Sequence, residues 1–594
     1  MRTAEFVRIA KEGRPVYISD VRRTFDADKG KSDIHCILDL LEDGKQSRFV
    51  ISIPPLAEGE EFIKSYVYAR IYNVLSSLGG KKLSIYIDTK NKDVLSLTNS
   101  LSDVFGIGAA RKDRIGYGRS INVIERMLGS VGGCDFNIDV QDIKSMPAAA
   151  KEGLKPVIAK VSYVDTAKNL KGTLCGIDIG GTDIKMAVSI DNNIEFFKEY
   201  DWFPANFTRI NQLIDPVLLL VKLVRHQLTF NALGGEEKIG RLLKRAMEKT
   251  ADNASIQTAV AICDEYYGQR TLLFDGIGLC FPDVVIKNKI VGGEVYKTRG
   301  IRDNSSIDYE KEFARLTHLN EMLQPHCAKG GIVKMTNDGP MAAYTAAIEM
   351  AFGEGEEKVE DGVFAHTLGT ELGTGWVDEH GEIPEIPLEV YNFIIDLGSF
   401  PEKQYQPDDL RSINNFNTGL PGTLQKYTSQ SGVFRLAIKY FTQERKDLYD
   451  ELIQKGFIEE RPEGLFVPIT PIDQRKPFLE HMMALPEREN CAVCKRIFED
   501  LGEFLAVTWL ETEDIMHPKA KQRYLFGRLV KNRLCFELMQ KGARRVVEGI
   551  TLIAADNEMA NTPLMKQLKN DPHYTIAQFA QAIGAIYYAM SGAV

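Results

Sequence analysis

The sequence predicts an α/β protein of at least two domains, with three as the expected number. Its 594 residues exceed the size at which a single hydrophobic core stops growing. Strand-like and helical stretches alternate along the chain, and two glycine-rich turns, "DIGGTDIK" and "LGTELGTG", each follow an apolar strand. We expect one domain at residues 1–170, a second at 171–335 together with a C-terminal helix at 574–594, and a third at 336–573.

Composition and charge narrow the class of protein. The net charge of −9 argues against a nucleic-acid-binding surface as the main function. The opening "MRTAEFVRIAKEG" is charged from its second residue, unlike a secretory leader, and the apolar run "PVLLLVKLV" is too short to span a bilayer. Nine scattered cysteines form no disulfide framework. We therefore expect a soluble, cytoplasmic protein with no membrane or nucleic-acid partner.

Residues 1–170 read as a mixed α/β domain without a chemical motif. "DIHCILDLL" and "SRFVISIP" flank Asp43-Gly44 as in a hairpin, and a helical stretch ends at Gly79-Gly80 before the strand "KKLSIYID". The domain fits either a docking or oligomerisation role or a degenerate copy of the α/β unit that follows.

The stretch "TLCGIDIGGTDIKMAVSIDNNIEFFKEYDWF" predicts three strands joined by tight turns, the first at Gly180-Gly181. Such glycines permit positive φ and close backbone approach, and their exposed N–H groups suit phosphate oxygens. Asp178 ends the first strand, and a carboxylate beside phosphate is favourable when a cation lies between them, so Asp178 is a candidate Mg²⁺ partner, directly or through water. Either glycine loop alone also fits a plain hairpin, but two in this order favour phosphate binding.

A third motif, "VKMTNDGPMAAYTAAIEM", delivers Asn337 and Asp338 to the end of an apolar strand. The helix begins at once, with Gly339-Pro340 in its first turn. This position at the edge of a sheet is where α/β proteins place their sites. Asp338 is the best candidate for a general base, and the alternative is that Asp338 only caps the helix.

The ordered set "GIDIGGTDIK", "GIGLCFPD", "TNDGPMAA" and "LGTELGTGW" resembles the ROK family of sugar kinases and related repressors, within the actin-like, Hsp70 and sugar kinase superfamily. "GTLQKYTSQSGVFRLA", "YLFGRLV" and "QAIGAIYYA" resemble later segments of that family, so the resemblance covers residues 172–594. It implies a two-lobed actin-like ATPase (ribonuclease H-like) fold behind an additional N-terminal α/β domain.

The resemblance also implies an activity and its residues. The activity is transfer of the γ-phosphate of ATP to a sugar hydroxyl, with a hexose such as glucose as the default acceptor; a homodimer is compatible with it. Such transfer requires alignment, charge neutralisation and a positioned base. The residues implied are Asp178 for Mg²⁺; Gly180, Gly181, Thr182, Gly369, Thr370, Gly373, Gly375 and Gly527 for ATP; Asn337 and Glu389 for the sugar; and Asp338 for its hydroxyl proton.

The chain departs from the family at its zinc site. Asn392 in "PLEVYN" stands where the family has a histidine ligand, and "NFNTGLPGT" has no cysteine where the family has several. Because all the soft ligands are lost together, we expect no zinc. The positions of the lost cysteines are nearest to Asn415, Asn417, Pro421 and Thr423.

Several residues keep two interpretations. Lys297 and Arg299 are either solvated surface residues or ligands of an anionic acceptor. "CAVC", Cys491 to Cys494, is more readily two half-buried thiols than a metal or redox site. His366 is expected in the core, and Asp183 puts a second acid beside the first glycine loop without an evident role.

Two other functions compete with the kinase. One is a non-catalytic sugar- or nucleotide-sensing regulator with the same fold, against which the retention of Asp338 argues, since a pure binder needs no base. The other uses the same machinery for ATP hydrolysis or acyl-phosphate formation. The N-terminal region does not resemble the helix-turn-helix of the family's repressors.

Overall fold

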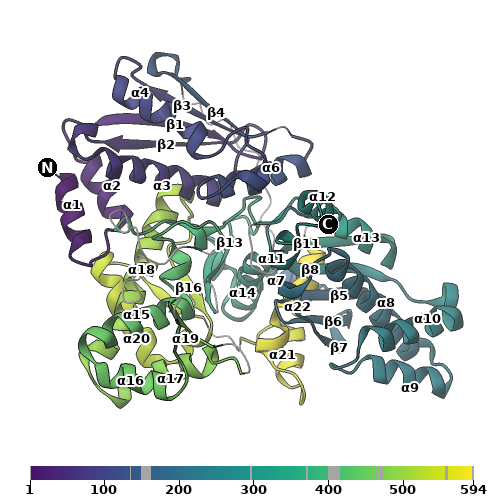
Figure 1. Ribbon diagram of the computed structural model, residues 1–594. Helices are drawn as coiled ribbons and strands as arrows, with labels where there is room; N and C mark the ends of the chain where they lie inside the picture. Colours follow the sequence, from purple (N-terminus) through teal and green to yellow (C-terminus); the bar gives the residue numbers. More distant parts are fainter. Residues whose placement is uncertain are drawn as a thin grey trace. The chain divides into compact units, whose positions relative to one another are not determined.

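The computed structural model describes residues 2–133, 135–148, 162–293, 298–369, 372–398, 415, 417–461, 464–468, 472–555 and 559–591. They form two compact units (Figure 1). The first unit comprises Met1–Pro156, His366–Thr374 and Ile386–Ala555, and the second comprises Val157–Ala365, Gly375–Glu385 and Asp556–Val594. The expected mixed α/β architecture is confirmed, whereas the domain limits at 170, 335 and 573 stay predictions.

The second unit is built on a five-stranded sheet in the order β11-β8-β5-β6-β7. Strands β5, β6 and β7 form the expected antiparallel meander, and β8 and β11 add in parallel on the other side of β5. Only β6 runs against the others, and this order and direction are those of the ribonuclease H-like fold. The bounds are β5 (Thr173–Ile179), β6 (Asp183–Ile190), β7 (Asn193–Asp201), β8 (Phe274–Phe281) and β11 (Cys327–Asn337).

The last helix, α22 (Ile576–Met590), packs directly on the strands β5 and β8. Glycine makes this contact possible at two points. A Cβ atom on Gly278 would lie 1.7 Å from the carbonyl oxygen of Ala585, and one on Gly176 would lie 1.9 Å from that of Ala582. No real side chain fits at such distances, so these two glycines set how closely helix and sheet approach.

The other face of the sheet is covered by long helices. Leu220 and Val224 of α8 are buried with Ile177 and Ile277 of the sheet in one apolar cluster. Among the described residues no helix is both long and apolar enough to cross a membrane. The remaining elements of this unit are α7 (Tyr163–Lys168), α8 (Asn211–Leu233), α9 (Glu237–Ala246), α10 (Asn253–Tyr267), β9 (Val285–Ile286), β10 (Lys289–Ile290), α11 (Arg299–Arg302), α12 (Tyr309–Phe313), α13 (Leu319–Leu323), α14 (Asp338–Glu354) and α21 (Pro563–Lys569).

A second sheet has the order β13-β12-β16-β17, with β16 and β17 parallel. Its strands β13, β12, β16 and β17 correspond in order to β6, β5, β8 and β11 of the five-stranded sheet. The described residues contain no counterpart of β7 in this second sheet. The strands are β12 (Val363–Leu368), β13 (Leu372–Val377), β16 (Arg523–Phe526) and β17 (Leu552–Ala554).

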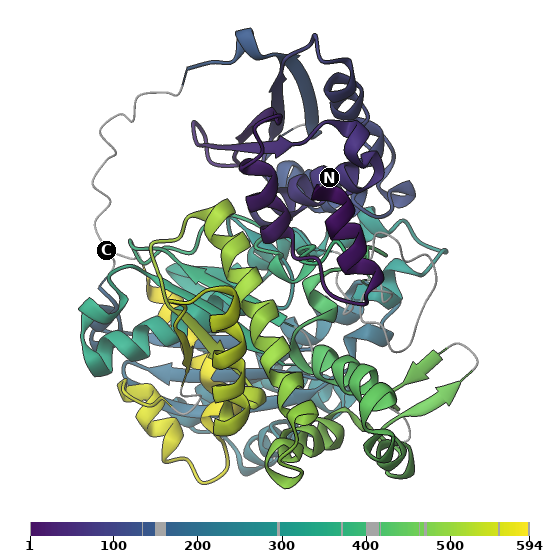
Figure 2. The same cartoon turned by 90° about the vertical axis from the view of Figure 1, so that its left-hand side faces the viewer.

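The chain after residue 425 is mostly helical, as expected. Its helices are α15 (Ser429–Glu444), α16 (Lys446–Gln454), α17 (Arg475–Arg488), α18 (Ala492–Met516), α19 (Arg528–Lys531) and α20 (Arg533–Val546). A small hairpin of β14 (Glu459–Arg461) and β15 (Gly464–Phe466) projects from them (Figure 2).

The N-terminal region of the first unit has its own sheet, in the order β2-β1-β3-β4. The expected hairpin between β1 and β2 and the glycine end of α3 at Gly79 are confirmed. Here β1 and β3 are antiparallel, whereas the corresponding central pair of the second unit, β5 and β8, is parallel, so the region is not a copy of that lobe. The elements are α1 (Arg2–Lys11), α2 (Ile18–Asp26), β1 (Ser32–Asp39), β2 (Gln46–Ile53), α3 (Glu60–Leu78), β3 (Lys82–Ile87), α4 (Lys92–Asn99), α5 (Leu101–Val104), α6 (Gly118–Ser130) and β4 (Asn137–Asp142).

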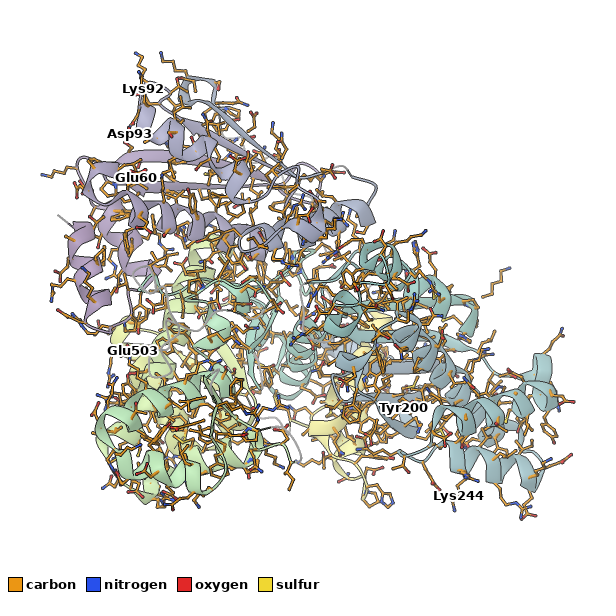
Figure 3. All side chains as sticks on the ribbon, viewed as in Figure 1. Glu60, Lys92, Asp93, Tyr200, Lys244 and Glu503 are labelled. Atoms are coloured by element: carbon orange, nitrogen blue, oxygen red, sulfur yellow. The ribbon has the colours of Figure 1, made fainter. Side chains whose placement is uncertain are left out.

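Buried charge joins this N-terminal region to α18. Arg70 of α3 is 2% exposed and pairs with Glu511 at 2.7 Å and with Asp514. The Tyr17 hydroxyl donates to Glu503 of the same helix at 2.9 Å (Glu503 is labelled in Figure 3). Because removing one partner of a buried ion pair leaves the other charge uncompensated, these contacts make the N-terminal region an integral part of the first unit.

Candidate active site

The carboxyl ends of three neighbouring parallel strands bring the predicted catalytic residues to one sheet edge. In the register of the second unit, Asp178 of β5 pairs with Cys280 of β8, and Phe281 of β8 pairs with Asn337 of β11. Asp338 follows Asn337 directly and begins α14. The sheet therefore assembles the first and third sequence motifs, which lie 160 residues apart, at the edge where α/β proteins bind ligands.

Asp178 is half-buried and lies close to other charged side chains. Burial raises the pKa of its carboxyl group to about 6, with Lys185 and a hydrogen bond from the Cys280 thiol (3.1 Å) acting against the rise and Asp338 and Asp183 adding to it. A carboxylate in such surroundings is favoured by a nearby cation.

The donor set fits Mg²⁺, which prefers oxygen ligands and is usually held by one or two carboxylates, water and substrate phosphates. Asp178 would be the protein ligand, directly or through water. Among the described residues no group of three or more His, Cys, Asp or Glu side chains is suited to hold a metal ion.

The first glycine loop is a tight turn closed by backbone hydrogen bonds. Gly180 N–H donates to the Asp183 carbonyl at 2.8 Å, and the Trp202 indole donates to the Gly180 carbonyl at 3.0 Å. Neither Gly180 nor Gly181 has a left-handed backbone, so the turn does not use the positive φ that glycine permits. Gly180 is required by space instead, since a Cβ there would lie 2.8 Å from the Asp183 carboxylate.

The acid that had no role in the sequence, Asp183, forms an ion pair with Lys185. Lys185 also lies opposite Asp178 in the antiparallel pairing of β5 and β6 and lowers its pKa. One lysine therefore serves two carboxylates. Sequence reasoning missed Lys185 and Cys280, although the alternation of strands β5 and β6 and the motif "GLCFPD" contain the signal for both.

Asn337, and not Asp338, caps helix α14. Its Oδ1 accepts from Gly339 N–H at 2.9 Å, and its amide donates to the Asp283 carbonyl at 2.7 Å. The alternative that Asp338 is the cap is therefore wrong. The cap fixes the start of the helix and leaves the Asp338 carboxylate as its first side chain, beside Asp178.

The second glycine loop follows β12 in the first unit. Gly527, which begins α19, has φ +109°, and a Cβ there would lie 2.4 Å from the Leu368 carbonyl oxygen, so no other residue fits. Gly369 O accepts from Gln430 N–H at 3.2 Å, and a Cβ on Gly373 would make ordinary van der Waals contact with the Thr367 side chain at 3.5 Å. Thr370 lies outside the described residues.

Two residues beside this loop have packing roles. A Cβ on Gly375 would lie 2.2 Å from the Gly339 carbonyl oxygen, so this glycine lets β13 approach α14 within the second unit. His366 is in the core, as expected: it is 2% exposed, its Nδ1 lies 3.0 Å from the Thr374 hydroxyl, and burial lowers its pKa to about 3.

Glu389 lies in a segment, residues 386–398, that runs against the N-terminal region of the same unit. Its carboxylate is buried and accepts from the Tyr391 hydroxyl at 3.2 Å, and its N–H donates to the Ser76 carbonyl at 3.1 Å. The Asn73 side chain both donates to and accepts from the backbone of Ile394, at 3.0 and 2.8 Å. No pattern in the sequence indicates that α3 holds this segment.

At the positions of the lost zinc ligands, two asparagines contact each other. The Asn415 amide donates to Asn392 Oδ1 at 3.0 Å, and both side chains are buried. Asn415 Oδ1 also accepts from the N–H groups of Asn417 and Thr418. A hydrogen-bonded amide pair thus joins the two segments that a metal would otherwise join.

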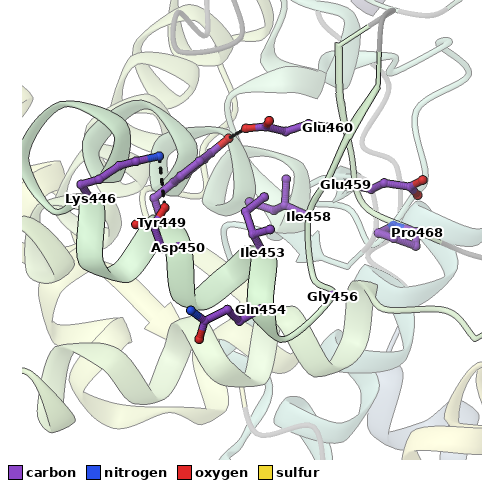
Figure 4. A pocket seen from close by; sticks show the side chains of 10 residues that line it. All are labelled: Lys446, Tyr449, Asp450, Ile453, Gln454, Gly456, Ile458, Glu459, Glu460 and Pro468. Atoms are coloured by element: carbon purple, nitrogen blue, oxygen red, sulfur yellow. Dashed lines mark hydrogen bonds and ion pairs between the residues drawn. The ribbon is translucent and has the colours of Figure 1, made fainter.

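Of the two cationic residues considered as ligands of an anionic acceptor, the structure describes only Arg299. Arg299 is exposed and pairs with Asp303 of the same short helix at 3.1 Å, as a solvated surface residue would. Lys297 lies outside the described residues. A surface groove of about 790 Å³ lies in the first unit between α16 and the β14–β15 hairpin, and its lining contains no predicted site residue (Figure 4).

No family model and no curated protein matches the chain. Similar solved structures are sugar kinases. A ROK-family glucokinase from Streptomyces griseus, in complex with glucose and AMPPNP, is 16% identical over 70% of this chain and 99% of its own, with a TM-score of 0.38. A ROK hexokinase from Thermus thermophilus is 13% identical over 70% and 98%, with a TM-score of 0.35. A glucokinase from Leishmania braziliensis is 10% identical over 71% and 94%, with a TM-score of 0.35.

Proposed function

We propose that the protein is an ATP-dependent kinase that phosphorylates a sugar hydroxyl, with a hexose such as glucose as the acceptor. The observation that carries the proposal is the pair of aspartates, Asp178 and Asp338, at the carboxyl edge of a ribonuclease H-like sheet, with the helix cap assigned to Asn337. A pure binding protein needs no second carboxylate at this edge.

In this proposal different residues of the chain have different roles in phosphoryl transfer. Asp338 accepts the proton of the attacking hydroxyl. Asp178 holds Mg²⁺, which neutralises phosphate charge when bound. The turn at Gly180, Gly181 and Thr182 and the loop at Gly369, Thr370, Gly373 and Gly527 contact the nucleotide, while Gly375 acts through packing.

Glu389 and Asn337 orient the sugar in this proposal. Asn337 retains one amide hydrogen and one oxygen lone pair beyond its two hydrogen bonds, so it can act as cap and ligand together. Glu389 is buried and oriented by Tyr391, which suits a carboxylate that accepts from sugar hydroxyls. A cytoplasmic location and a homodimer stay predictions.

The test is release of ADP with and without a panel of neutral and phosphorylated sugars. The kinase releases ADP only with an acceptor, an ATPase releases it without one, and a regulator releases none. Turnover of glucose but not of phosphorylated sugars would also remove the idea of an anionic acceptor.

The base is tested by Asp338→Ala, with Asp303→Ala as a control at an exposed aspartate of the same unit. We expect transfer to fall by about 10²–10⁴-fold, the usual contribution of a general base, while the affinity for ATP stays within about twofold. The control should keep full activity. If Asp338→Ala retains most of the transfer rate, the assignment of the base is wrong.

A further inference from the structure

The CxxC motif at the start of α18 has a geometry that the kinase function does not use. Cys491 is the N-cap of the helix, and its Sγ accepts from the Cys494 N–H at 3.4 Å. The two Sγ atoms are 2.9 Å apart. Since a disulfide bond is about 2 Å long, a small shift of the two side chains is enough to join them.

The two thiols differ in access. Cys494 is 1% exposed, whereas Cys491 is partly exposed. Among the other cysteines that the structure describes, all six are buried. Cys491 is therefore the described thiol that a reagent in solution reaches first.

The two thiols also differ in acidity. Partial burial opposes ionisation of Cys491, but hydrogen bonds from the thiol and N–H of Cys494, together with the nearby Arg445 guanidinium, hold its pKa below the ordinary value. Burial raises the pKa of Cys494 to about 12. A low-pKa exposed thiol at a helix N-terminus followed by a buried one is the pattern of an attacking and a resolving cysteine.

We propose that Cys491 and Cys494 form a redox-active dithiol that exchanges with small-molecule disulfides such as oxidised glutathione. The Cys491 thiolate attacks one sulfur of the disulfide, and the first glutathione leaves as its thiolate, which gives a mixed disulfide. Cys494 then loses its proton and attacks Cys491 Sγ, and the second glutathione leaves as its thiolate. The protein is oxidised by two electrons, and the disulfide is reduced to two thiols.

A metal site is less suited to the same pair. Structural zinc in proteins takes four ligands, and no group of three His, Cys, Asp or Glu side chains suited to a metal occurs in the described part of the chain. The close approach of the two sulfurs, the N-cap hydrogen bond and the unequal exposure are instead all features that thiol–disulfide exchange requires.

The experiment is peptide mapping by mass spectrometry of the full chain after incubation with oxidised glutathione and quenching with an alkylating agent. We expect one intramolecular Cys491–Cys494 disulfide, which dithiothreitol reverses. Before oxidation, alkylation of the folded protein should be fastest at Cys491. Mapping by peptide keeps Cys134, outside the described residues, separate from the pair.

Variants identify the order of attack. Cys494→Ser should accumulate the mixed disulfide at Cys491, and Cys491→Ser should leave position 494 unmodified. Cys535→Ser, which removes a buried thiol on α20, should behave as the unchanged protein. A pair that stays reduced, or a stable glutathione adduct in the unchanged protein, would overturn the proposal, and this measurement does not depend on the folding of any variant.

Discussion

Single residues in this protein perform more than one task, and Lys185 shows this most clearly. It neutralises Asp183 and at the same time lowers the pKa of Asp178 across the strand pair. Its loss would remove the cation that pairs with Asp183 and that lowers the pKa of Asp178. The glycine turn and Asp178 are thus stabilised by the same side chain.

A carboxyl group outside the site gives a pH-dependent prediction. Burial raises the pKa of Asp500 on α18 to about 6, with the Tyr440 hydroxyl acting against the rise and Glu503 adding to it. The folded state therefore binds more protons than the unfolded state between pH 3.8 and 6, and this group reduces stability as the pH rises through that window.

Asp500→Asn should accordingly raise the free energy of unfolding at pH 8 by about 3 kcal/mol at most, since the pKa is raised from 3.8 to about 6 and one pKa unit corresponds to about 1.4 kcal/mol. At pH 4 the gain should be largely lost. Urea unfolding at both pH values measures it. Asp447→Asn is the control of opposite sign, because Arg445 lowers the pKa of Asp447 to about 2, so that variant should lose stability at pH 8. A gain at pH 4 equal to that at pH 8 would contradict the mechanism.

The sequence could predict which residues lie at the candidate site better than what each of them does there. Asp178 and Asp338 follow apolar strands, a signal that needs only local pattern. Three roles depend instead on which groups come into contact in the folded chain: the helix cap at Asn337, the ion pair of Asp183 and the lack of room for a side chain at Gly180. The sequence alone cannot decide, for example, whether Asn337 or the neighbouring Asp338 caps the helix, because both side chains can accept the same hydrogen bond.

At the scale of elements, the close contact between α22 and the sheet depends on glycines, which have no side chain to separate the helix from the strands. Gly278→Ala places a methyl group against the Ala585 carbonyl, so either the helix or the strand must move. We expect a loss of about 3 kcal/mol or more in the free energy of unfolding. Gly549→Ala, at a glycine with open surroundings, should change it by less than about 0.5 kcal/mol. Equal effects of the two variants in thermal unfolding would show that this contact can relax.

The segment 386–398 gives the second prediction at this scale. Asn73→Ala leaves the N–H and C=O of Ile394 without their buried side-chain partner. Each unsatisfied group costs about 1–3 kcal/mol, so the segment that carries Glu389 should loosen. If Glu389 binds the acceptor, the KM for the sugar should rise while the KM for ATP is unchanged.

Two measurements keep the parts of this prediction separate. Loss of hydrogen-exchange protection in residues 386–398 tests the support by α3 without any assay of activity. Asn99→Ala, an exposed asparagine at the end of α4, is the matched control and should change neither quantity. An unchanged exchange pattern in Asn73→Ala would refute the structural role, whereas changed exchange with an unchanged KM would refute only the role of Glu389.

Elements were predictable where periodicity is strong. The meander of β5, β6 and β7 and the helical stretch before Gly79 follow from alternation and turn residues. The support of the segment 386–398 by α3 was not predictable, because it joins residues more than 300 positions apart through backbone hydrogen bonds that leave no pattern in the sequence.

At the scale of the whole molecule, the strand order β11-β8-β5-β6-β7 is that of the ribonuclease H-like fold, which the family resemblance implied. The N-terminal region is different: its strand directions are not those of a ribonuclease H-like lobe, and its contacts are with residues 386–555 of the first unit. Its association with that part of the chain includes buried ion pairs, an aromatic contact between Tyr17 and Phe504, and backbone hydrogen bonds such as that from Ile18 N–H to the Ile395 carbonyl.

The last prediction tests whether this N-terminal region and α18 unfold together. Arg70 is buried and pairs with Glu511, which is fully buried and also pairs with Arg22. Arg70→Ala leaves the Glu511 carboxylate short of one partner in the interior, and such changes typically cost about 3–5 kcal/mol. Arg23→Ala removes a chemically similar pair with Asp20 that is exposed, and should cost less than about 1 kcal/mol. Denaturant unfolding followed by hydrogen exchange should show α3 and α18 losing protection at the same denaturant concentration in Arg70→Ala. If α3 loses protection while α18 keeps it, the N-terminal region is an independent domain that merely docks.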